Sequence, residues 1–332
     1  MSEEIPPLVL RRREDRRLRS GHPWIFSNEV DTGKSPLTDF QPGDWVNVRA
    51  HGGAPLGTAY VNPGTLIAAR MVSRAPNRPL DRAGIEHRIE TALSLRQRLF
   101  PAPFYRLVYG ESDGLPGLVV DRHGDVVVAQ IGTQGMERLR DDVVAALDSR
   151  LKPRALVLRN DTPARATEGL AEYVETVIGE APDTVRIEEN GARFEIDPLR
   201  GQKCGWFYDQ RDNRARLARY VSGARVLDVF CYAGGFGIQA ARAGALAVQC
   251  VDGSQAACEI AEKNAALNEC SDRIAVRRDD AFDALKSSAA SGERFDAVVL
   301  DPPAFARRRR DLKSATEAYT RLNRLAIQLL ES

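Results

Sequence analysis

The residues with the clearest chemical potential lie in the last third of the chain, where apolar runs end in glycine or acidic residues. VLDVFCYAGGFG, residues 226–237, ends one such run in a glycine-rich turn. The next two runs end in Asp252 and in the pair Asp279 and Asp280. A glycine turn lets a ligand approach the backbone, and carboxylates accept hydrogen bonds from ribose hydroxyls or an adenine amino group. The three endings predict a nucleoside-binding edge, although the turn lacks the GxGxxG pattern of dinucleotide sites.

A fourth apolar run, FDAVVLDPPAF at residues 295–305, ends in Asp301 and two prolines. Proline has no N–H to donate to a neighbouring strand, so Pro302 and Pro303 are expected to end the strand at the predicted site. They should stiffen the loop and leave the Asp301 carboxylate facing a planar base. The loop would then form the substrate side of a cofactor site.

The elements that position these residues alternate regularly after residue 201. Strands are expected at 224–230, 246–252, 273–280 and 295–301, each followed by a helical pattern, the last of which spans 314–331. Short apolar strands that alternate with helices predict a parallel sheet in a doubly wound α/β domain. Because parallel strands place their carboxyl ends at one edge, the acidic and glycine-rich endings should meet there.

The upstream residues have a different pattern and predict two further domains. Residues 1–75 contain short strands punctuated by glycine, which is typical of a small β-barrel. Residues 76–198 combine helical periodicity at 81–100 with several strands, and an Asn-Gly turn at 190–191 predicts a hairpin. The expected division is a barrel, a central α+β domain and an α/β domain at 199–332.

The composition predicts a globular cytoplasmic protein. Hydrophobic residues make up 43% of the 332 residues, charged residues 28%, and the net charge is +1. No apolar run approaches the roughly 20 residues that span a bilayer, and the N-terminus has no secretory signal pattern, so no membrane partner is expected. The five cysteines form no CxxC pair and only four histidines are present, so no metal site is predicted. Free, mostly buried thiols are expected instead.

Arginines cluster near both ends of the chain despite the near-neutral net charge. One cluster begins at residues 11–13 and the other spans residues 307–310. Local basic patches of this kind can bind a phosphate backbone. The alternative is that each cluster is a solvated face neutralised by neighbouring acidic residues.

Eight motifs extend over nearly the whole chain. They are LVLRRREDRRLRSGHPWIFSNEV, YGESDGLPGLVVDRHGD, GQKCGWFYDQRDNR, VLDVFCYAGGF, VDGSQ, RRDDAF, LDPPAF and AYTRLNRLAIQLL. In combination they resemble the bacterial 23S ribosomal RNA large-subunit methyltransferase I family. The resemblance implies an N-terminal RNA-binding PUA domain, a class I methyltransferase domain and S-adenosylmethionine as cofactor. It also implies that the product is 5-methylcytosine in 23S ribosomal RNA.

The resemblance assigns roles to individual residues. Asp252 is expected to bind the ribose and Asp280 to lie near the adenine. Asp301 is expected beside the cofactor, and as the catalytic residue that handles the N3 proton of the target cytosine. Further cofactor contacts are implied for Phe207, Tyr208, Gln210, Arg211, Asp228, Cys231, Tyr232, Ala233, Gly234, Gly235, Phe236 and Asp279. RNA contacts are implied for Arg11, Arg12, Arg13, Trp24, Arg307, Arg308, Arg309 and Arg310.

The sequence departs from the family pattern at the nucleophile. Methylation of cytosine C5 uses a cysteine thiolate that adds to C6 and makes C5 nucleophilic. In the family this thiolate follows the helix that ends AIQLLES here, so the chain is expected to be C-terminally truncated and its sheet to lack the last strands. Alanine, not cysteine, follows Pro302-Pro303. None of the five cysteines is expected to replace the thiolate: Cys204, Cys231, Cys250, Cys258 and Cys270.

Three other interpretations stay open. The protein could methylate another atom or another RNA, or it could bind RNA without catalysis. A nucleotide-dependent oxidoreductase is disfavoured by the missing GxGxxG pattern and by the Asp-Pro-Pro loop. The sequence leaves the oligomeric state open, with a homodimer as one expectation.

Overall fold

The computed structural model describes residues 5–201, 204–306 and 311–331. The chain divides into two compact units. The first comprises Met1–Asp183 and Pro198–Trp206, and the second comprises Thr184–Asp197 and Phe207–Ser332. No helix among the described residues is long and apolar enough to cross a membrane.

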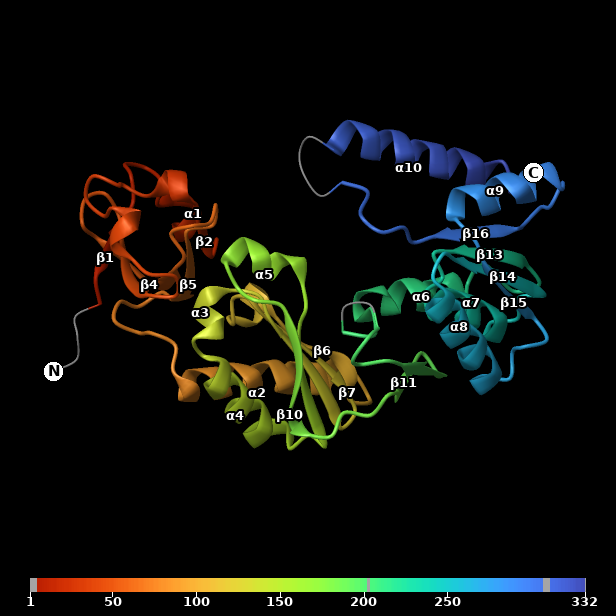
Figure 1. Ribbon diagram of the computed structural model, residues 1–332, viewed down its shortest axis with the longest axis horizontal. Helices are drawn as coiled ribbons and strands as arrows, with labels where there is room; N and C mark the ends of the chain where they lie inside the picture. The colour runs from red at the N-terminus through yellow and green to blue at the C-terminus, as the bar shows by residue number, and fades with distance from the viewer. Residues whose placement is uncertain (1–4, 202–203, 307–310, 332) are drawn as a thin grey trace. The chain divides into compact units, whose positions relative to one another are not determined.

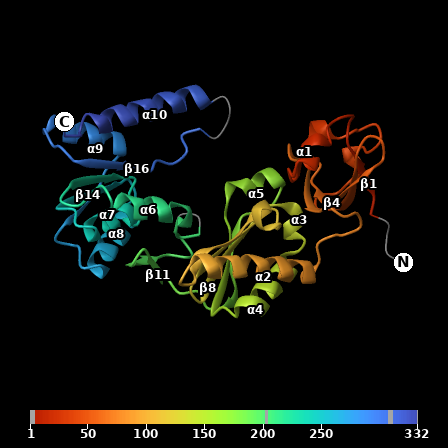
Figure 2. The same ribbon diagram turned by 180° about the vertical axis from the view of Figure 1, so that it is seen from behind.

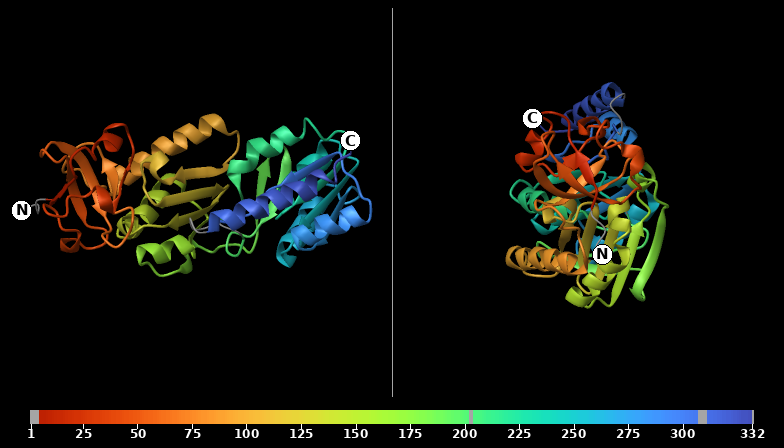
Figure 3. Two further views of the ribbon diagram at one scale, coloured as in Figure 1. Left: turned by 90° about the horizontal axis from the view of Figure 1, so that it is seen from above. Right: turned by 90° about the vertical axis from the view of Figure 1, so that its left-hand side faces the viewer.

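The first unit begins with a five-stranded sheet of order β1-β3-β4-β5-β2, in which only the β1–β3 pair is parallel. Figure 3 shows this part of the chain in red and orange. Its strands enclose an apolar core of their own, which includes Leu8, Ile25, Val46 and Val61. The strands are β1 (Pro7–Val9), β2 (Trp24–Ile25), β3 (Trp45–Arg49), β4 (Pro55–Val61) and β5 (Ala69–Ser73), with the short helix α1 (Arg16–Arg19) between β1 and β2. The predicted β-rich N-terminal domain is confirmed.

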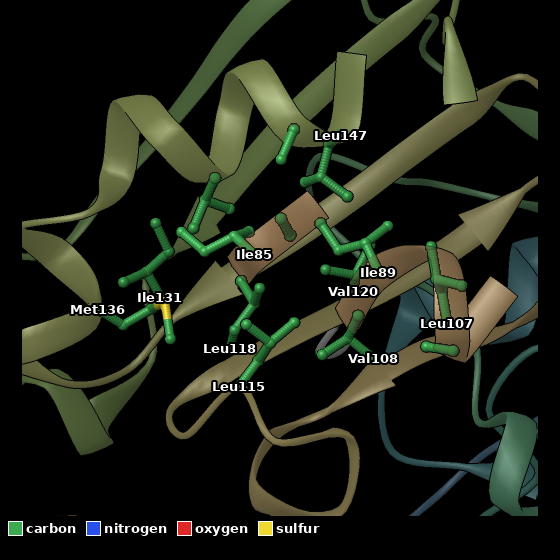
Figure 4. Close-up of a cluster of buried hydrophobic side chains, with 14 of the residues drawn as sticks. Ile85, Ile89, Leu107, Val108, Leu115, Leu118, Val120, Ile131, Met136 and Leu147 are labelled. Carbon is green, nitrogen blue, oxygen red and sulfur yellow. The ribbon is translucent and has the colours of Figure 1, made fainter. Parts of the chain in front are cut away.

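A second sheet in this unit has the order β10-β9-β8-β7-β6, and only β8 and β9 pair in parallel. Helices α2 (Arg82–Leu99) and α4 (Arg140–Leu151) cover one face, and Figure 4 shows Ile85, Ile89 and Leu147 packed with Val120 of the sheet. The strands are β6 (Phe104–Tyr109), β7 (Leu118–His123), β8 (Val126–Ile131), β9 (Ala155–Asn160) and β10 (Tyr173–Gly179). The predicted combination of strands and helices in the central region is confirmed.

The central region differs from the sequence-based expectation in its connections. Two helices, α3 (Gln134–Glu137) and α4, follow β8, and neither helix α5 (Pro163–Glu168) nor strand β10 was among the elements predicted from the sequence. A Cβ on Gly135 would lie 2.2 Å from the ring of Tyr60, so packing against the barrel places α3. Strand β10 is largely exposed, so it carries little of the apolar alternation that predicts a strand.

The second unit is a doubly wound α/β domain, as predicted. Its sheet has the order β15-β14-β13-β16 with every pair parallel. Helices α7 and α8 lie on one face and α9 and α10 on the other (Figure 1, Figure 2). The strands are β13 (Arg225–Val229), β14 (Ala247–Asp252), β15 (Ile274–Arg278) and β16 (Ala297–Leu300). The helices are α6 (Arg211–Leu217), α7 (Gly235–Arg242), α8 (Gln255–Leu267), α9 (Ala281–Ala290) and α10 (Leu312–Ile327).

The predicted hairpin is present and belongs to this second unit. It consists of β11 (Val185–Glu189) and β12 (Ala192–Ile196). Asn190 and Gly191 both have left-handed backbones, with φ of 51° and 76°, as a two-residue hairpin turn requires. The hairpin is fastened to α8, because Asn264 accepts a hydrogen bond from the Glu195 N–H at 2.6 Å.

Candidate active site

The predicted cofactor-binding acids lie where the four parallel strands of the second unit end. The turn 230–234 follows β13, Asp252 ends β14, Asp279 and Asp280 follow β15, and Asp301 follows β16. The carboxyl ends of parallel strands share one edge, which is where ligands bind in open α/β sheets. The sheet topology therefore brings these four strand ends to a common edge.

The turn after β13 has an unusual backbone. Phe230, Tyr232 and Gly234 have φ of 65°, 48° and 78°, a left-handed region that is costly for the two aromatic residues. Two contacts hold the turn: the Tyr232 N–H donates to Asp252 Oδ2 at 2.9 Å, and Asn264 Nδ2 donates to the Ala233 carbonyl at 3.1 Å. The first N–H groups of α7 follow directly and have no acceptor within the helix. The turn and the helix start together offer backbone donors to an anionic group.

Asp252 is held by two backbone donors. Its Oδ2 accepts from Tyr232 N and its Oδ1 accepts from Ser254 N, both at 2.9 Å. Ser254 caps α8, since its hydroxyl oxygen accepts from the Ala257 N–H at 3.3 Å. The two bonds leave lone pairs on both carboxylate oxygens, so Asp252 can still accept from vicinal hydroxyls of a ribose.

The acids after β15 are already engaged by the protein. Asp280 caps α9 and accepts from the N–H groups of Phe282 and Asp283 at 2.9 and 3.2 Å. Asp279 pairs with Arg277 and accepts from the Asp280 N–H at 2.9 Å. Their proximity to adenine stays a prediction, and these contacts favour Asp280 as a residue that sets the local backbone.

The structure joins the segment FYDQRDNR to the loop after β16. Gln210 Nε2 donates to Asp301 Oδ1 at 3.1 Å, and Gln210 Oε1 accepts from Asn213 Nδ2 at 2.7 Å. The ring of Phe207 packs edge-to-face on that of Tyr232, with centroids 5.7 Å apart. These contacts gather four residues of the predicted site, Phe207, Gln210, Tyr232 and Asp301, around one sheet edge.

Asp228 at the end of β13 is fully buried. Burial raises the pKa of this carboxyl to about 7, and the negative charge of Asp301 also raises it. The Gly237 N–H, which donates to Oδ2 at 2.9 Å, lowers the pKa and so opposes the shift. Its other oxygen, Oδ1, has no hydrogen-bond partner among the described residues. A strand edge with several carboxyls suits a cationic ligand, and S-adenosylmethionine carries a positively charged sulfonium. The residues present therefore fit the expected cofactor.

Glu189 and Arg214, which the sequence did not single out, support the site through buried ion pairs. The Glu189 side chain is fully buried and pairs with Arg214 at 2.6 Å and Arg211 at 3.4 Å. Arg214 also donates to the Phe207 carbonyl at 2.7 Å. The sequence gives little indication of this pairing. Arg211 and Arg214 lie in the motif GQKCGWFYDQRDNR, but no local pattern connects them with Glu189, which precedes the Asn-Gly turn.

Tyr319 of α10 holds the Asp-Pro-Pro loop. Its hydroxyl accepts from the Phe305 N–H at 3.3 Å and donates to the Pro303 carbonyl at 3.4 Å. The two rings of Tyr319 and Phe305 lie 4.6 Å apart. Tyr319 lies in the motif AYTRLNRLAIQLL, one of those that carry the family resemblance, and this position was the only indication in the sequence that it could matter to the site.

All five cysteines are free and buried, as expected. Burial raises the pKa of the Cys204, Cys258 and Cys270 thiols. A hydrogen bond with Cys250, together with burial, raises the pKa of Cys231. A reactive nucleophile needs a lowered thiol pKa and access to substrate, and the four thiols with a raised pKa have neither.

The residues predicted to contact RNA fall into three groups. Arg11, Arg12 and Arg13 are exposed on the barrel, and Arg11 Nε donates to the Val30 carbonyl at 3.0 Å. Trp24 is half-buried, and its indole N–H donates to Glu111 Oε1 at 2.6 Å. The cluster at 307–310 lies outside the described residues.

Comparison with protein families gives two matches. Residues 8–74 match the PUA-like domain, and residues 140–331 match the S-adenosylmethionine-dependent methyltransferase family. The chain is 39% identical over 323 residues to the ribosomal RNA large subunit methyltransferase I of Shewanella denitrificans, covering 95% of this chain and 80% of that protein. It is 37% identical over 328 residues to the enzyme of the same name from Cronobacter sakazakii, covering 97% and 82%.

Solved structures show the same fold at lower sequence identity. A Streptococcus mutans protein assigned as a SAM-dependent methyltransferase matches with a TM-score of 0.83 at 21% identity, over 99% of this chain and 84% of that one. A second chain, assigned as a methyltransferase and solved with SAH, matches with a TM-score of 0.84 at 22% identity, over the same shares. The barrel and the parallel sheet thus have known counterparts. With its PUA-like domain, its methyltransferase domain and this identity to curated relatives, the chain belongs to the ribosomal RNA large subunit methyltransferase I family, whose cofactor is S-adenosylmethionine.

Proposed function

We propose that this protein transfers a methyl group from S-adenosylmethionine to cytosine C5 in 23S ribosomal RNA. The observation that carries the proposal is the convergence of Gln210, Asp228, Asp252 and Asp301 at one sheet edge, in a chain of this family. When bound, S-adenosylmethionine supplies an electrophilic methyl group on a sulfonium. The side chains and backbone of this chain bind the cofactor, orient the target base and handle its proton.

The proposed roles follow the contacts of each residue. Asp252 is held by two N–H groups in a position to accept from ribose hydroxyls. The backbone of residues 231–236 provides donors for the methionine carboxylate, with Phe207 packed against that turn. Asp301, oriented by Gln210, accepts or returns the N3 proton of the target base.

The burial of all five thiols bears on the position of the methyl group. Methylation at C5 requires a thiolate to add to C6, and none of the cysteines of this chain is suited to that step. A second candidate is therefore methylation of an RNA atom that already carries a lone pair and needs no thiolate. Both candidates use the same cofactor site, and they differ in the product.

The RNA side of the proposal involves the PUA-like domain. Arg11, Arg12, Arg13 and Trp24, with the arginines at 307–310, are proposed to contact the ribosomal RNA backbone. We also propose the division into 1–75, 76–198 and 199–332, in which the hairpin of β11 and β12 packs with the third region although it precedes residue 199. The proposed site of action is the cytoplasm, where bacterial ribosomal RNA is made. A homodimer stays a prediction that analytical ultracentrifugation would test.

The deciding experiment is methyl transfer from labelled S-adenosylmethionine to 23S ribosomal RNA that lacks modifications, followed by nucleoside mass spectrometry. Label in 5-methylcytosine supports the first candidate and means that a buried thiol becomes accessible during turnover. Label in another nucleoside supports the second candidate. Cofactor binding without any transfer contradicts both and favours an RNA-binding role.

A further inference from the structure

The first unit contains a pocket of about 540 Å³ that no predicted cofactor residue lines. Its walls come from β2, from the turn after β6, from the facing ends of β7 and β8, and from the start of α5. The residues that matter to its chemistry are Trp24, Tyr109, Glu111 and Gln130. Its volume lies in the range of small-molecule sites.

The pocket is built on a rigid frame. The hydroxyl of Tyr60 in the barrel donates to the Pro116 carbonyl at 3.1 Å. Asn62 donates to Glu168 at 2.8 Å, and Arg70 pairs with the same carboxylate at 2.9 Å. These buried contacts join the barrel to the central sheet, so the pocket is preformed.

Two aromatic side chains line the pocket, and both are held in place. Tyr109 is 58% exposed, which is unusual for a large ring, yet the guanidinium of Arg106 lies 5.5 Å from the ring centroid. Arg106 is itself fixed by two hydrogen bonds of 2.9 Å to Asp121. The Trp24 indole is oriented by its bond to Glu111. Fixed and partly open aromatic rings are the surfaces on which unstacked RNA bases pack.

Two polar groups in the lining can recognise the edge of a base. Glu111 Oε1 takes the Trp24 N–H, which leaves Oε2 as an acceptor without a hydrogen-bond partner within the described residues. Gln130 Nε2 is buried and has no hydrogen-bond partner in the described part of the chain. The pocket thus combines an acceptor with an unused amide donor. A carboxylate oxygen pairs with an exocyclic amino group, and an amide N–H pairs with a base carbonyl.

We infer that this pocket binds one unstacked base of the RNA substrate, and that it prefers a base with both an amino group and a carbonyl, such as cytosine. The inference rests on the proposed function for the identity of the substrate, but not on methyl transfer. Uracil lacks the exocyclic amino group and could donate to Glu111 only through its ring N3–H, so it should bind more weakly.

The test measures binding of short labelled oligo(C) and oligo(U) to the full chain by fluorescence anisotropy, without cofactor. Tyr109→Ala should weaken oligo(C) binding at least about fivefold, because the base can no longer stack on an aromatic ring. Tyr109→Phe keeps the ring and should bind like the unchanged protein. Tyr220→Ala in the second unit is the matched control, since Tyr220 is 70% exposed. Both tyrosines are largely exposed, so their substitution should leave the fold intact.

Glu111→Gln tests the edge contact, since its side-chain carbonyl can still accept from Trp24. It should reduce the preference for oligo(C) over oligo(U), while Tyr109→Ala weakens both. Equal binding of the two RNAs to the unchanged protein would overturn base selection, and unchanged binding by Tyr109→Ala would overturn the site. Methylation assays separate this inference from the proposed function: Tyr109→Ala should raise KM for RNA while the cofactor Kd stays constant. A chain that shows the binding pattern but never methylates RNA would contradict the proposed function alone.

Discussion

Two carboxyls of the candidate active site, Asp228 and Asp252, differ in their surroundings although they lie at the ends of neighbouring strands. Asp252 is half-buried and accepts two backbone hydrogen bonds. Asp228 is fully buried, with one backbone bond and one oxygen that has no partner among described residues. The first is arranged to present its charge to a ligand, whereas the second resists ionisation. Each residue therefore leads to a different measurement.

Asp252→Ala should weaken S-adenosylmethionine binding at least tenfold. A hydrogen bond to a charged acceptor contributes about 1.5–3 kcal/mol, and about 1.4 kcal/mol corresponds to a factor of ten. Isothermal titration calorimetry would measure the Kd. Asp272→Ala is the matched control, because that carboxylate is 76% exposed and precedes β15, at the amino end of the strand and not at its carboxyl end. An unchanged Kd for Asp252→Ala would remove the ribose contact from the proposal.

The buried Asp228 should make the stability of the cofactor-free protein depend on pH. Its pKa is raised to about 7 in the folded chain and is near 3.8 when exposed. The folded state therefore holds the proton more tightly, so its stabilising contribution is complete below about pH 4 and is lost as the pH rises to about 7. The effect is on the order of a few kcal/mol, at about 1.36 kcal/mol per pKa unit. Urea unfolding at several pH values should show a smaller loss of stability in Asp228→Asn than in the unchanged protein; equal losses would contradict the assignment.

At the scale of elements, the hairpin of β11 and β12 supports the cofactor site although it comes before the α/β domain in sequence. Glu189 ends β11 and pairs with Arg211 and Arg214 of α6. Gln239 of α7 donates to the Glu189 carbonyl at 2.8 Å. One buried acid thus connects a strand with the helices on either side of the turn at 230–234, and its removal should disturb the whole edge.

Glu189→Gln should destabilise the second unit by roughly 3 kcal/mol, because two nearly buried guanidinium groups lose their counter-charge. It should also weaken cofactor binding, since Arg214 positions the Phe207 carbonyl. Urea unfolding and calorimetry would measure the two effects. Glu188→Gln, one residue away on the exposed face of the same strand, should change neither. If both variants behave alike, the ion pairs do not stabilise the site.

At the scale of the whole molecule, the net charge of +1 conceals a barrel surface with several exposed arginines. Arg12 and Arg13 are exposed and lie in the PUA-like domain, for which we propose contacts with RNA. Nucleic-acid binding that neutralises phosphates becomes weaker with salt in proportion to the number of phosphates neutralised. Salt dependence therefore reports how many arginines meet the RNA backbone.

Replacing Arg12 and Arg13 with glutamine should weaken RNA binding and reduce the slope of log K against log salt by about 0.7 for each phosphate that is no longer neutralised. Replacing all four arginines at 307–310 should act in the same direction. Filter binding over a series of salt concentrations would measure the slopes. Arg186→Gln, an exposed arginine of the hairpin that pairs with Glu195, is the control. Slopes that match the control would exclude these arginines from the interface.

The sequence alone determined the features that depend on near neighbours. The alternation of strands and helices after residue 201 and the Asn-Gly hairpin both follow from periodicity and turn chemistry within a few residues. The convergence of Asp252 and Asp301 also followed, because parallel strands must place their carboxyl ends together. Family resemblance then supplied roles that spacing could not assign.

Only the tertiary structure decided which of these side chains are already engaged. It committed Asp280 to a helix cap, buried Asp228, and paired Glu189 with arginines more than 20 residues away. It also brought Trp24 to Glu111, 87 residues apart, and so created the pocket in the first unit. Contacts at such separations arise when whole elements pack, and no local pattern of residues contains them. The free energy of that packing determines burial, and burial determines which acids keep their charge for a ligand.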